Sequence, residues 1–284
     1  MRYSERITTM QSSPIRKLAH IASSAKAKGI KIYHLNIGQP DIKTPKVFFE
    51  AVKNFNNEVL EYAVSPGLPE LISSLQQYYT TYNMDFESDE ILVTNDGSDA
   101  LLFALMATCD PKDNILVPEP FYSNYNGFSQ SINVNITPIT TKAEEGFHLP
   151  SKEKIQSLIT SKTKAILISN PGNPTGTVYT KKELYMISEI AKENDLWIIS
   201  DEVYREFVYD GLEYTSFGNI KEVEDRVIII DSVSKRYSAC GARIGSIASK
   251  DKTIIAGILK LCQGRLCVST LDQVGSVELY NTPS

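Results

Sequence analysis

Polar residues that could do chemistry stand directly after short apolar runs of the sequence. Asp201 follows Leu196–Ser200, where burying a carboxylate is costly unless a cation or a hydrogen-bond donor meets it. A solvated loop or a helix cap is the alternative. Lys235 lies within Asp231–Tyr237, after the run Arg226–Ile230. A desolvated lysine can attack a carbonyl group, although Lys235 taken alone would be a surface lysine.

Gly97 and Ser98 form a candidate anion site, because they follow the run Glu90–Thr94 and precede a predicted helix. Free N–H groups and the helix dipole favour a phosphate at such a helix N-terminus. The alternative is that Ser98 only caps the helix. The carboxylate of Asp96, one residue earlier, would have to turn its side chain away from a bound phosphate.

The segment Asn170–Gly176 reads NPGNPTG and follows the run Lys164–Ser169. Two prolines and two glycines fix a rigid, irregular loop, in which the side chains of Asn170 and Asn173 are free to hydrogen-bond. An ordinary turn is the alternative, but chance poorly explains a seven-residue pattern of this kind.

Other chemistries receive less support. Ser232 and Lys235 spell S-x-x-K, the nucleophile motif of penicillin-recognising acyl enzymes, but the companion S-D-N and K-T-G motifs are absent from the sequence. The four cysteines contain no C-x-x-C pair and are interpreted as reduced thiols. The three histidines match no metal-ligand spacing, so no metal site is predicted.

Charge and hydropathy argue against several partners. The formal net charge of −5 offers no attraction to nucleic acid or to anionic membranes. No apolar run approaches the roughly 20 residues of a membrane-spanning helix, and the N-terminal sequence lacks the apolar core of a signal peptide. We therefore expect a cytoplasmic protein that binds neither nucleic acid nor membranes.

The elements that must position these residues alternate between strands and helices. Several predicted strands are nearly continuous in apolar residues, which is typical of strands buried on both faces of a parallel sheet. Helices are predicted over Ser98–Thr108 and Lys181–Glu193. The alternation predicts a doubly wound α/β domain, in which ligands bind beyond the carboxyl ends of the strands. The predicted strands are Glu90–Thr94, Asn114–Val117, Lys164–Ser169, Leu196–Ser200, Arg226–Ile230 and Arg243–Ala248.

The first 45 residues have a different pattern. Pro14–Lys28 predicts a short amphipathic helix, and an extended stretch and a turn-rich segment follow it. We expect residues 1–45 to form an arm together with part of a smaller domain, and residues 46–284 to form the large domain.

The motifs NPGNPTG, SDEVY and SVSKRYSACGARIG, in this order and at these spacings, closely resemble the fold-type-I pyridoxal-phosphate-dependent aminotransferases of class I and II, the aspartate/aromatic aminotransferase-like enzymes. The resemblance extends to GQPD at Gly38–Asp41, to Tyr62 with the following PGLPEL, to VTNDGSDAL and to VPEPFYSNY. It therefore covers nearly the whole chain. It implies a three-layer α/β/α large domain with a mostly parallel sheet that binds pyridoxal 5'-phosphate.

By that resemblance, Lys235 holds the cofactor as an internal aldimine and then moves a proton between the substrate Cα and the cofactor. Asp201 pairs with the pyridinium nitrogen, which keeps the ring an electron sink. Tyr204 and Asn173 hydrogen-bond the phenolic oxygen of the ring, and Tyr122 stacks on the ring face.

The resemblance also implies a site for the cofactor phosphate at the predicted helix N-terminus. An arginine contributes to it, because a guanidinium suits phosphate oxygens. Glycine or another small residue is commoner where this chain has Asp96, whose backbone is expected to join the site. The implied phosphate ligands are Asp96, Gly97, Ser98, Ser232 and Arg243.

The implied reaction passes an amino group from an amino acid to a 2-oxo acid, with Gly38 and Asn173 lining the substrate pocket. Tyr62 matches a tyrosine that reaches the phosphate in the other subunit of a homodimer. The C-terminal small domain, with the arginine that binds the substrate carboxylate, is expected to be missing from these 284 residues. The lysine motif leaves β-elimination and decarboxylation open. A catalytically silent fragment that binds the cofactor or a partner chain is a further alternative.

Overall fold

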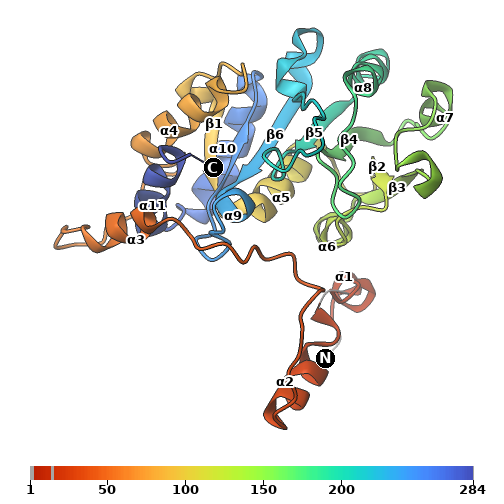
Figure 1. Cartoon of the computed structure of the whole chain (residues 1–284). Coiled ribbons are helices and arrows are strands. Elements are labelled where there is room, and N and C mark those ends of the chain that lie inside the picture. Colours follow the sequence, from red (N-terminus) through yellow and green to blue (C-terminus); the bar gives the residue numbers. More distant parts are fainter. Residues whose placement is uncertain (1–2, 14–15, 284) are drawn as a thin grey trace.

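The computed structural model describes residues 3–13 and 16–283, and a seven-stranded sheet forms its centre (Figure 1). Strand β7 runs antiparallel to both of its neighbours, and the other pairs are parallel. In the order β1-β7-β6-β5-β4-β2-β3, the strands are Ile91–Thr94, Gly245–Ala248, Val227–Ser232, Trp197–Asp201, Thr163–Ser169, Asn114–Glu119 and Asn135–Thr140.

All six predicted strands are present, each within two residues of its predicted bounds. The sequence did not predict β3, and the reason is physical. β3 is an edge strand that pairs only with β2, and its residues are mostly exposed or half-buried. It therefore lacks the continuous apolar pattern of a strand buried on both faces.

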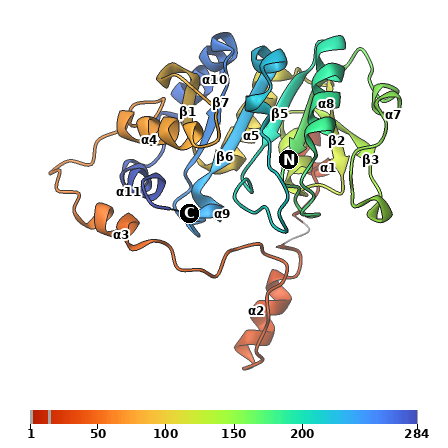
Figure 2. The same cartoon turned by 45° about the horizontal axis from the view of Figure 1, so that its top comes forward.

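Helices cover both faces of the sheet, which confirms the three-layer α/β/α fold (Figures 1 and 2). Successive side chains of a strand point to opposite faces. In β4, Ile166 and Ile168 accordingly pack on one core, whereas Ala165 and Leu167 pack on the other. The first core contains side chains of α4 (Pro69–Thr80), α8 (Lys181–Glu193) and α11 (Thr270–Tyr280), and the second those of α5 (Asp96–Thr108), α6 (Asn124–Ser131) and α10 (Lys252–Arg265).

Helix α8 shows how local sequence sets an element at its predicted bounds. Thr180 and Glu183 form a capping box at its start, an arrangement whose loss costs about 1 kcal/mol. Leu184, Ile187 and Ile190 recur at helical spacing and are fully buried against the sheet.

The N-terminal segment makes few contacts with the rest of the chain. No residue of α1 (Glu5–Thr9) or α2 (Ala19–Ala27) is buried, and α2 projects away from the sheet (Figures 1 and 2). Of the predicted helix Pro14–Lys28, the C-terminal part forms α2, whereas Pro14 lies outside the described residues. The chain rejoins the body at α3 (Lys46–Lys53), which packs on α11. The division at residue 45 stays a prediction.

Two short helices, α7 (Lys152–Gln156) and α9 (Val233–Arg236), complete the α-helices of the described ranges. Within these ranges, no helix has the length and apolar content needed to cross a membrane. The described 3-10 turns are Ser88–Glu90, Ala143–Glu145, Phe217–Asn219 and Lys221–Arg226.

Candidate active site

The topology brings the predicted site residues to one edge of the sheet. The carboxyl ends of the parallel strands β1, β2, β4, β5 and β6 meet there, and the antiparallel strand β7 begins there. Asp201 ends β5, Lys235 follows β6, and Arg243 precedes β7. This is the edge at which ligands bind in sheets of this kind.

Asp201 is a buried carboxylate that meets only neutral groups. Its side chain accepts hydrogen bonds from Tyr125 Oη at 2.5 Å and from the backbone N–H of Val203 at 3.4 Å, and no cation of the described residues pairs with it. Burial raises the pKa of Asp201 to about 6, against the lowering effect of the Tyr125 hydrogen bond. The structure therefore rejects the solvated-loop alternative, and it adds Tyr125, which the sequence had not singled out.

Lys235 is held close to Tyr204 by a glycine from the N-terminal segment. Its Nζ donates to the carbonyl oxygen of Gly38 at 2.8 Å. A Cβ at Gly38 would lie 4.0 Å from Tyr204 Oη, so these three residues form one cluster. The lysine lies on the single-turn helix α9 (Val233–Arg236), directly after β6.

The charge of Asp201 also acts on two further tyrosines, Tyr204 and Tyr122. Burial and, to a smaller extent, the charge of Asp201 raise the pKa of Tyr204 to about 12. The pKa of Tyr122 is also raised by burial and by Asp201. The hydroxyl of Tyr122 accepts a hydrogen bond from Asn124 Nδ2 at 2.7 Å. Both phenols are therefore neutral near pH 7.

Beside this cluster lies a group of hydrogen-bond donors that we call the anion cup: the backbone N–H of Gly97 and the side chains of Ser232, Ser234 and Arg243. Every one of these donors is directed at the carboxylate of Asp96. Gly97 N donates at 2.8 Å and Ser234 Oγ at 3.0 Å, and Ser232 Oγ and Arg243 Nη1 complete the set.

The anion cup unites three of the predicted phosphate ligands and adds Ser234. The side chain of Asp96 is turned into the cup. The expectation that this side chain turns away concerns a bound phosphate and stays a prediction. The cup offers this carboxylate both hydroxyl and guanidinium donors, and charge-assisted hydrogen bonds of this kind are strong.

Three predicted residues lie apart from these clusters. Asn173 lines a small hollow together with Phe121 and Tyr125. Ser98 lies in the first turn of α5, and no hydrogen bond within the described chain joins it to the cup. Tyr62 is 81% exposed on the loop before α4, and its predicted contact with a second subunit stays a prediction.

A buried ionic network that the sequence interpretation missed lies directly behind the site. Arg205 donates to Glu202 at 2.8 Å and to Asp231 at 3.1 Å, and Arg236 donates to Asp231 at 2.6 and 2.7 Å. Although burial works against the charge, these carboxylates hold the pKa of Arg205 well above its usual value. Glu202 adjoins Asp201 in sequence, so the network supports the strand end that carries the site.

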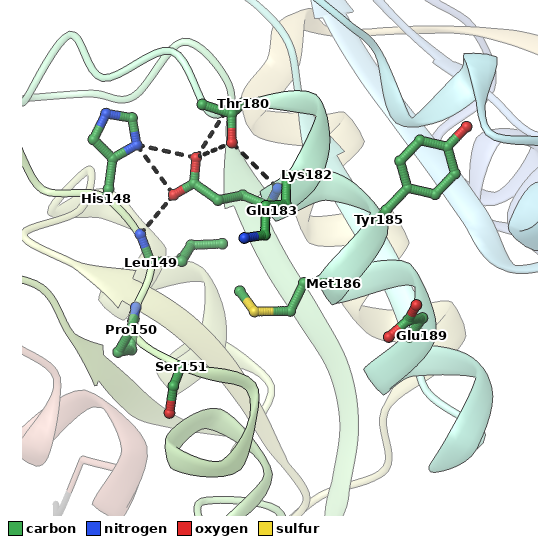
Figure 3. A pocket seen from close by; sticks show the side chains of 10 residues that line it. All are labelled: His148, Leu149, Pro150, Ser151, Thr180, Lys182, Glu183, Tyr185, Met186 and Glu189. Carbon is green, nitrogen blue, oxygen red and sulfur yellow. Dashed lines mark hydrogen bonds and ion pairs between the residues drawn. The ribbon is translucent and has the colours of Figure 1, made fainter.

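A hollow of about 810 Å³ lies elsewhere, between residues 148–151 and α8 (Figure 3). Its polar centre is the Glu183 carboxylate, which accepts from His148 Nδ1 at 3.0 Å and from the backbone N–H groups of Leu149 and Thr180 at 2.8 Å. These contacts cap α8. None of the predicted site residues lines this hollow, so it is separate from the candidate site.

Comparison with known proteins gives the family. Residues 30–284 match the model of aminotransferase class I and II. A probable aspartate aminotransferase of Methanocaldococcus jannaschii is 33% identical over 282 residues, which cover 96% of this chain and 72% of the relative. The structure of an aspartate aminotransferase from Thermotoga maritima has a TM-score of 0.93 at 30% identity, covering 99% of this chain and 75% of that one. The structure of an alanine aminotransferase from Pyrococcus furiosus has a TM-score of 0.91 at 33% identity, and the match covers 99% of this chain and 73% of that one.

The fold is that of an α/β enzyme, and the predicted site residues lie at the carboxyl edge of the sheet, where ligands bind in sheets of this kind. The chain belongs to the class I and II aminotransferases. Members of this family transfer amino groups, and amino-group transfer is the function of this protein.

Proposed function

We propose that the chain binds pyridoxal 5'-phosphate at the carboxyl edge of its sheet, with Lys235 as the covalent attachment point and Asp201 against the pyridine nitrogen. The observation that carries this proposal is the Asp201 carboxylate, which is 7% exposed and meets only neutral donors. A buried carboxylate of this kind is stabilised by a cation, and a protonated pyridine nitrogen would be one.

The remaining groups of the edge fit the same cofactor. Tyr204, beside Lys235 through Gly38, would hydrogen-bond the phenolic oxygen together with Asn173, and Tyr122 would cover the ring face. The anion cup contains buried hydroxyls, a backbone N–H and a guanidinium, a donor set that suits phosphate oxygens. It would therefore hold the cofactor phosphate.

When bound, pyridoxal phosphate supplies an electron sink for the negative charge that develops at the substrate Cα. The chain supplies proton transfer and orientation. The Lys235 amine would take up and move the proton of the substrate Cα, a role that requires the amine to be released from the cofactor and to lie within hydrogen-bond reach of that carbon. Asp201 keeps the pyridine nitrogen protonated, and the neutral Tyr204 hydroxyl donates to the phenolic oxygen.

The substrates in this proposal are an amino acid as the amino donor and a 2-oxo acid as the acceptor, with Gly38 and Asn173 beside the reacting atoms. Formation of a 2-oxo acid without release of ammonia supports transamination. Release of ammonia or of carbon dioxide would instead favour elimination or decarboxylation on the same scaffold. Aspartate and an aromatic amino acid are the donors to test first.

We also propose a homodimer in which Tyr62 completes the active site of the other subunit. Val59, Leu60, Tyr62 and Val64 are all more than half exposed on the loop before α4. Such a cluster of exposed apolar side chains marks a surface that another chain covers. Sedimentation analysis should give a dimer, and Tyr62→Ala should weaken cofactor binding. A monomer that binds the cofactor with undiminished affinity in this variant would contradict the proposal.

The test of the central proposal is covalent attachment. The protein with added pyridoxal phosphate should show the absorbance band of the lysine-bound cofactor, and Lys235→Ala should abolish it. Lys252→Ala is the matched control, because Lys252 is exposed beside Asp89 at the opposite edge of the sheet. No band in the unmodified chain, or an unchanged band in Lys235→Ala, would refute the assignment.

A further inference from the structure

We propose that Asp96 is a resident anion in the cup that would hold the cofactor phosphate, so that this chain discriminates only weakly between phosphorylated and unphosphorylated forms of the cofactor. This inference rests on the proposed function. It makes Asp96 a residue that determines cofactor specificity by competition with the phosphate.

All donors of the anion cup are already engaged by one carboxylate, that of Asp96. The hydroxyls of Ser232 and Ser234 belong to residues that are 1% and 4% exposed, and buried hydroxyls need a partner. Both donate to the same Asp96 oxygen, Oδ1, that accepts from Gly97 N. Arg243 donates to the other oxygen, Oδ2. The carboxylate thus takes the place of an anionic ligand.

Charge balance makes the two anions exclusive. Arg243 is the cation of the cup, and its single positive charge is matched by the single negative charge of Asp96. A phosphate ester carries roughly two negative charges at neutral pH. With both anions present, like charges would lie a few ångströms apart and repel each other strongly in a partly buried site. The phosphate therefore has to displace the Asp96 carboxylate.

The backbone around Asp96 is fixed, so displacement has to come from the side chain. The carbonyl oxygen of Asp96 accepts from Thr94 Oγ1 at 3.1 Å. A Cβ on Gly245 would lie only 2.5 Å from the Asp96 carbonyl carbon, which shows how closely β7 packs on this backbone. Asp96 also has φ of 67°, a conformation that glycine adopts without strain. Replacement by glycine would therefore remove the carboxylate from the cup and keep the backbone conformation around it.

The experiment compares the dissociation constants of pyridoxal phosphate and pyridoxal, which differ only in the phosphate, for the full chain and for Asp96→Gly and Asp96→Asn. The ratio of the pyridoxal constant to the pyridoxal phosphate constant measures what the phosphate contributes. Asp96→Gly should raise this ratio roughly tenfold or more, because the donors that Asp96 occupies would become available to make charged hydrogen bonds with the phosphate. Asp96→Asn, which removes the charge but keeps the shape, should raise it less.

Inorganic phosphate provides a second measurement that does not depend on Lys235. Calorimetric titration should show phosphate binding to Asp96→Gly and at least tenfold weaker binding to the unmodified chain. Asp195→Gly is the matched control, since Asp195 also has a left-handed φ of 52° but is exposed and precedes β5 at the opposite edge. It should behave like the unmodified chain.

The outcomes separate this inference from the proposed function. An unchanged ratio in both Asp96 variants, or equal phosphate binding with and without Asp96, overturns the inference while cofactor attachment to Lys235 can still stand. Phosphate binding gained by Asp96→Gly, in a protein that attaches no cofactor, supports the cup but refutes the proposed function. If Asp96→Gly does not fold, Asp96→Asn tests the inference: a raised ratio supports it, and an unchanged ratio overturns it.

Discussion

Asp201→Asn should stabilise the cofactor-free protein while weakening cofactor binding. The pKa of Asp201 is raised from its usual value of 3.8 to about 6, chiefly by burial. This rise corresponds to about 3 kcal/mol against the charged form in the folded state. Asparagine keeps a side-chain oxygen that can accept from Tyr125 but has no charge to bury.

The sign of the effect fixes its pH dependence. A carboxyl whose folded pKa is raised stabilises the fold below its unfolded pKa, and this contribution is lost as the pH rises through the folded pKa. The advantage of Asp201→Asn should therefore grow by up to about 3 kcal/mol between about pH 4 and pH 7 and then stay constant.

Urea unfolding at several pH values, followed by the fluorescence of Trp197, the single tryptophan, measures this difference. Asp195→Asn, an exposed carboxylate at the start of the same strand, should show no comparable trend. With added pyridoxal phosphate, the unmodified chain should instead have the higher unfolding free energy. An advantage that does not change with pH, or that occurs equally in Asp195→Asn, would refute the burial argument.

Three further changes test neighbouring contacts. Tyr125→Phe removes the hydrogen bond that lowers the pKa of Asp201, so the decline of the unfolding free energy, which begins near the unchanged unfolded pKa, should extend to a higher pH than in the unmodified chain. Arg205→Met leaves two buried carboxylates without their shared cation and should lower the unfolding free energy by about 3 to 5 kcal/mol; a urea midpoint close to that of the unmodified chain would contradict this. Glu183→Gln should weaken the α8 cap by about 1 kcal/mol and leave the affinity for pyridoxal phosphate, measured by absorbance titration, unchanged.

The sequence predicted the sheet well because its central strands are buried on both faces. Such strands require nearly continuous apolar residues, and the polar residues that follow them must lie at one edge. This reasoning places Asp201 and Lys235 at the same edge of the sheet, whereas Arg243 is predicted there only by the resemblance to aminotransferases. It failed for β3, an edge strand whose exposed residues carry no comparable signal.

The buried partners of the site were not predictable in the same way. Arg205 meets Asp231 because β5 and β6 pair side by side, and neither local pattern nor hydropathy indicates that an arginine will be fully buried. The hydrogen bonds of the Asp96 side chain were not predictable for a similar reason. They depend on donors from β6 and from the start of β7, more than 130 residues away in the sequence.

The antiparallel course of β7 places the two residues proposed to hold the cofactor, Lys235 and Arg243, on one piece of chain. Ser232 at the end of β6 pairs with Gly245 at the start of β7, and both Lys235 and Arg243 lie in the short connection between them. The separation of Lys235 and Arg243 is therefore set largely by the pairing of β6 with β7 and by the connection between them. A slip of one residue in this pairing would move both residues at once, so this connection would set the distance between the two proposed contacts with the cofactor.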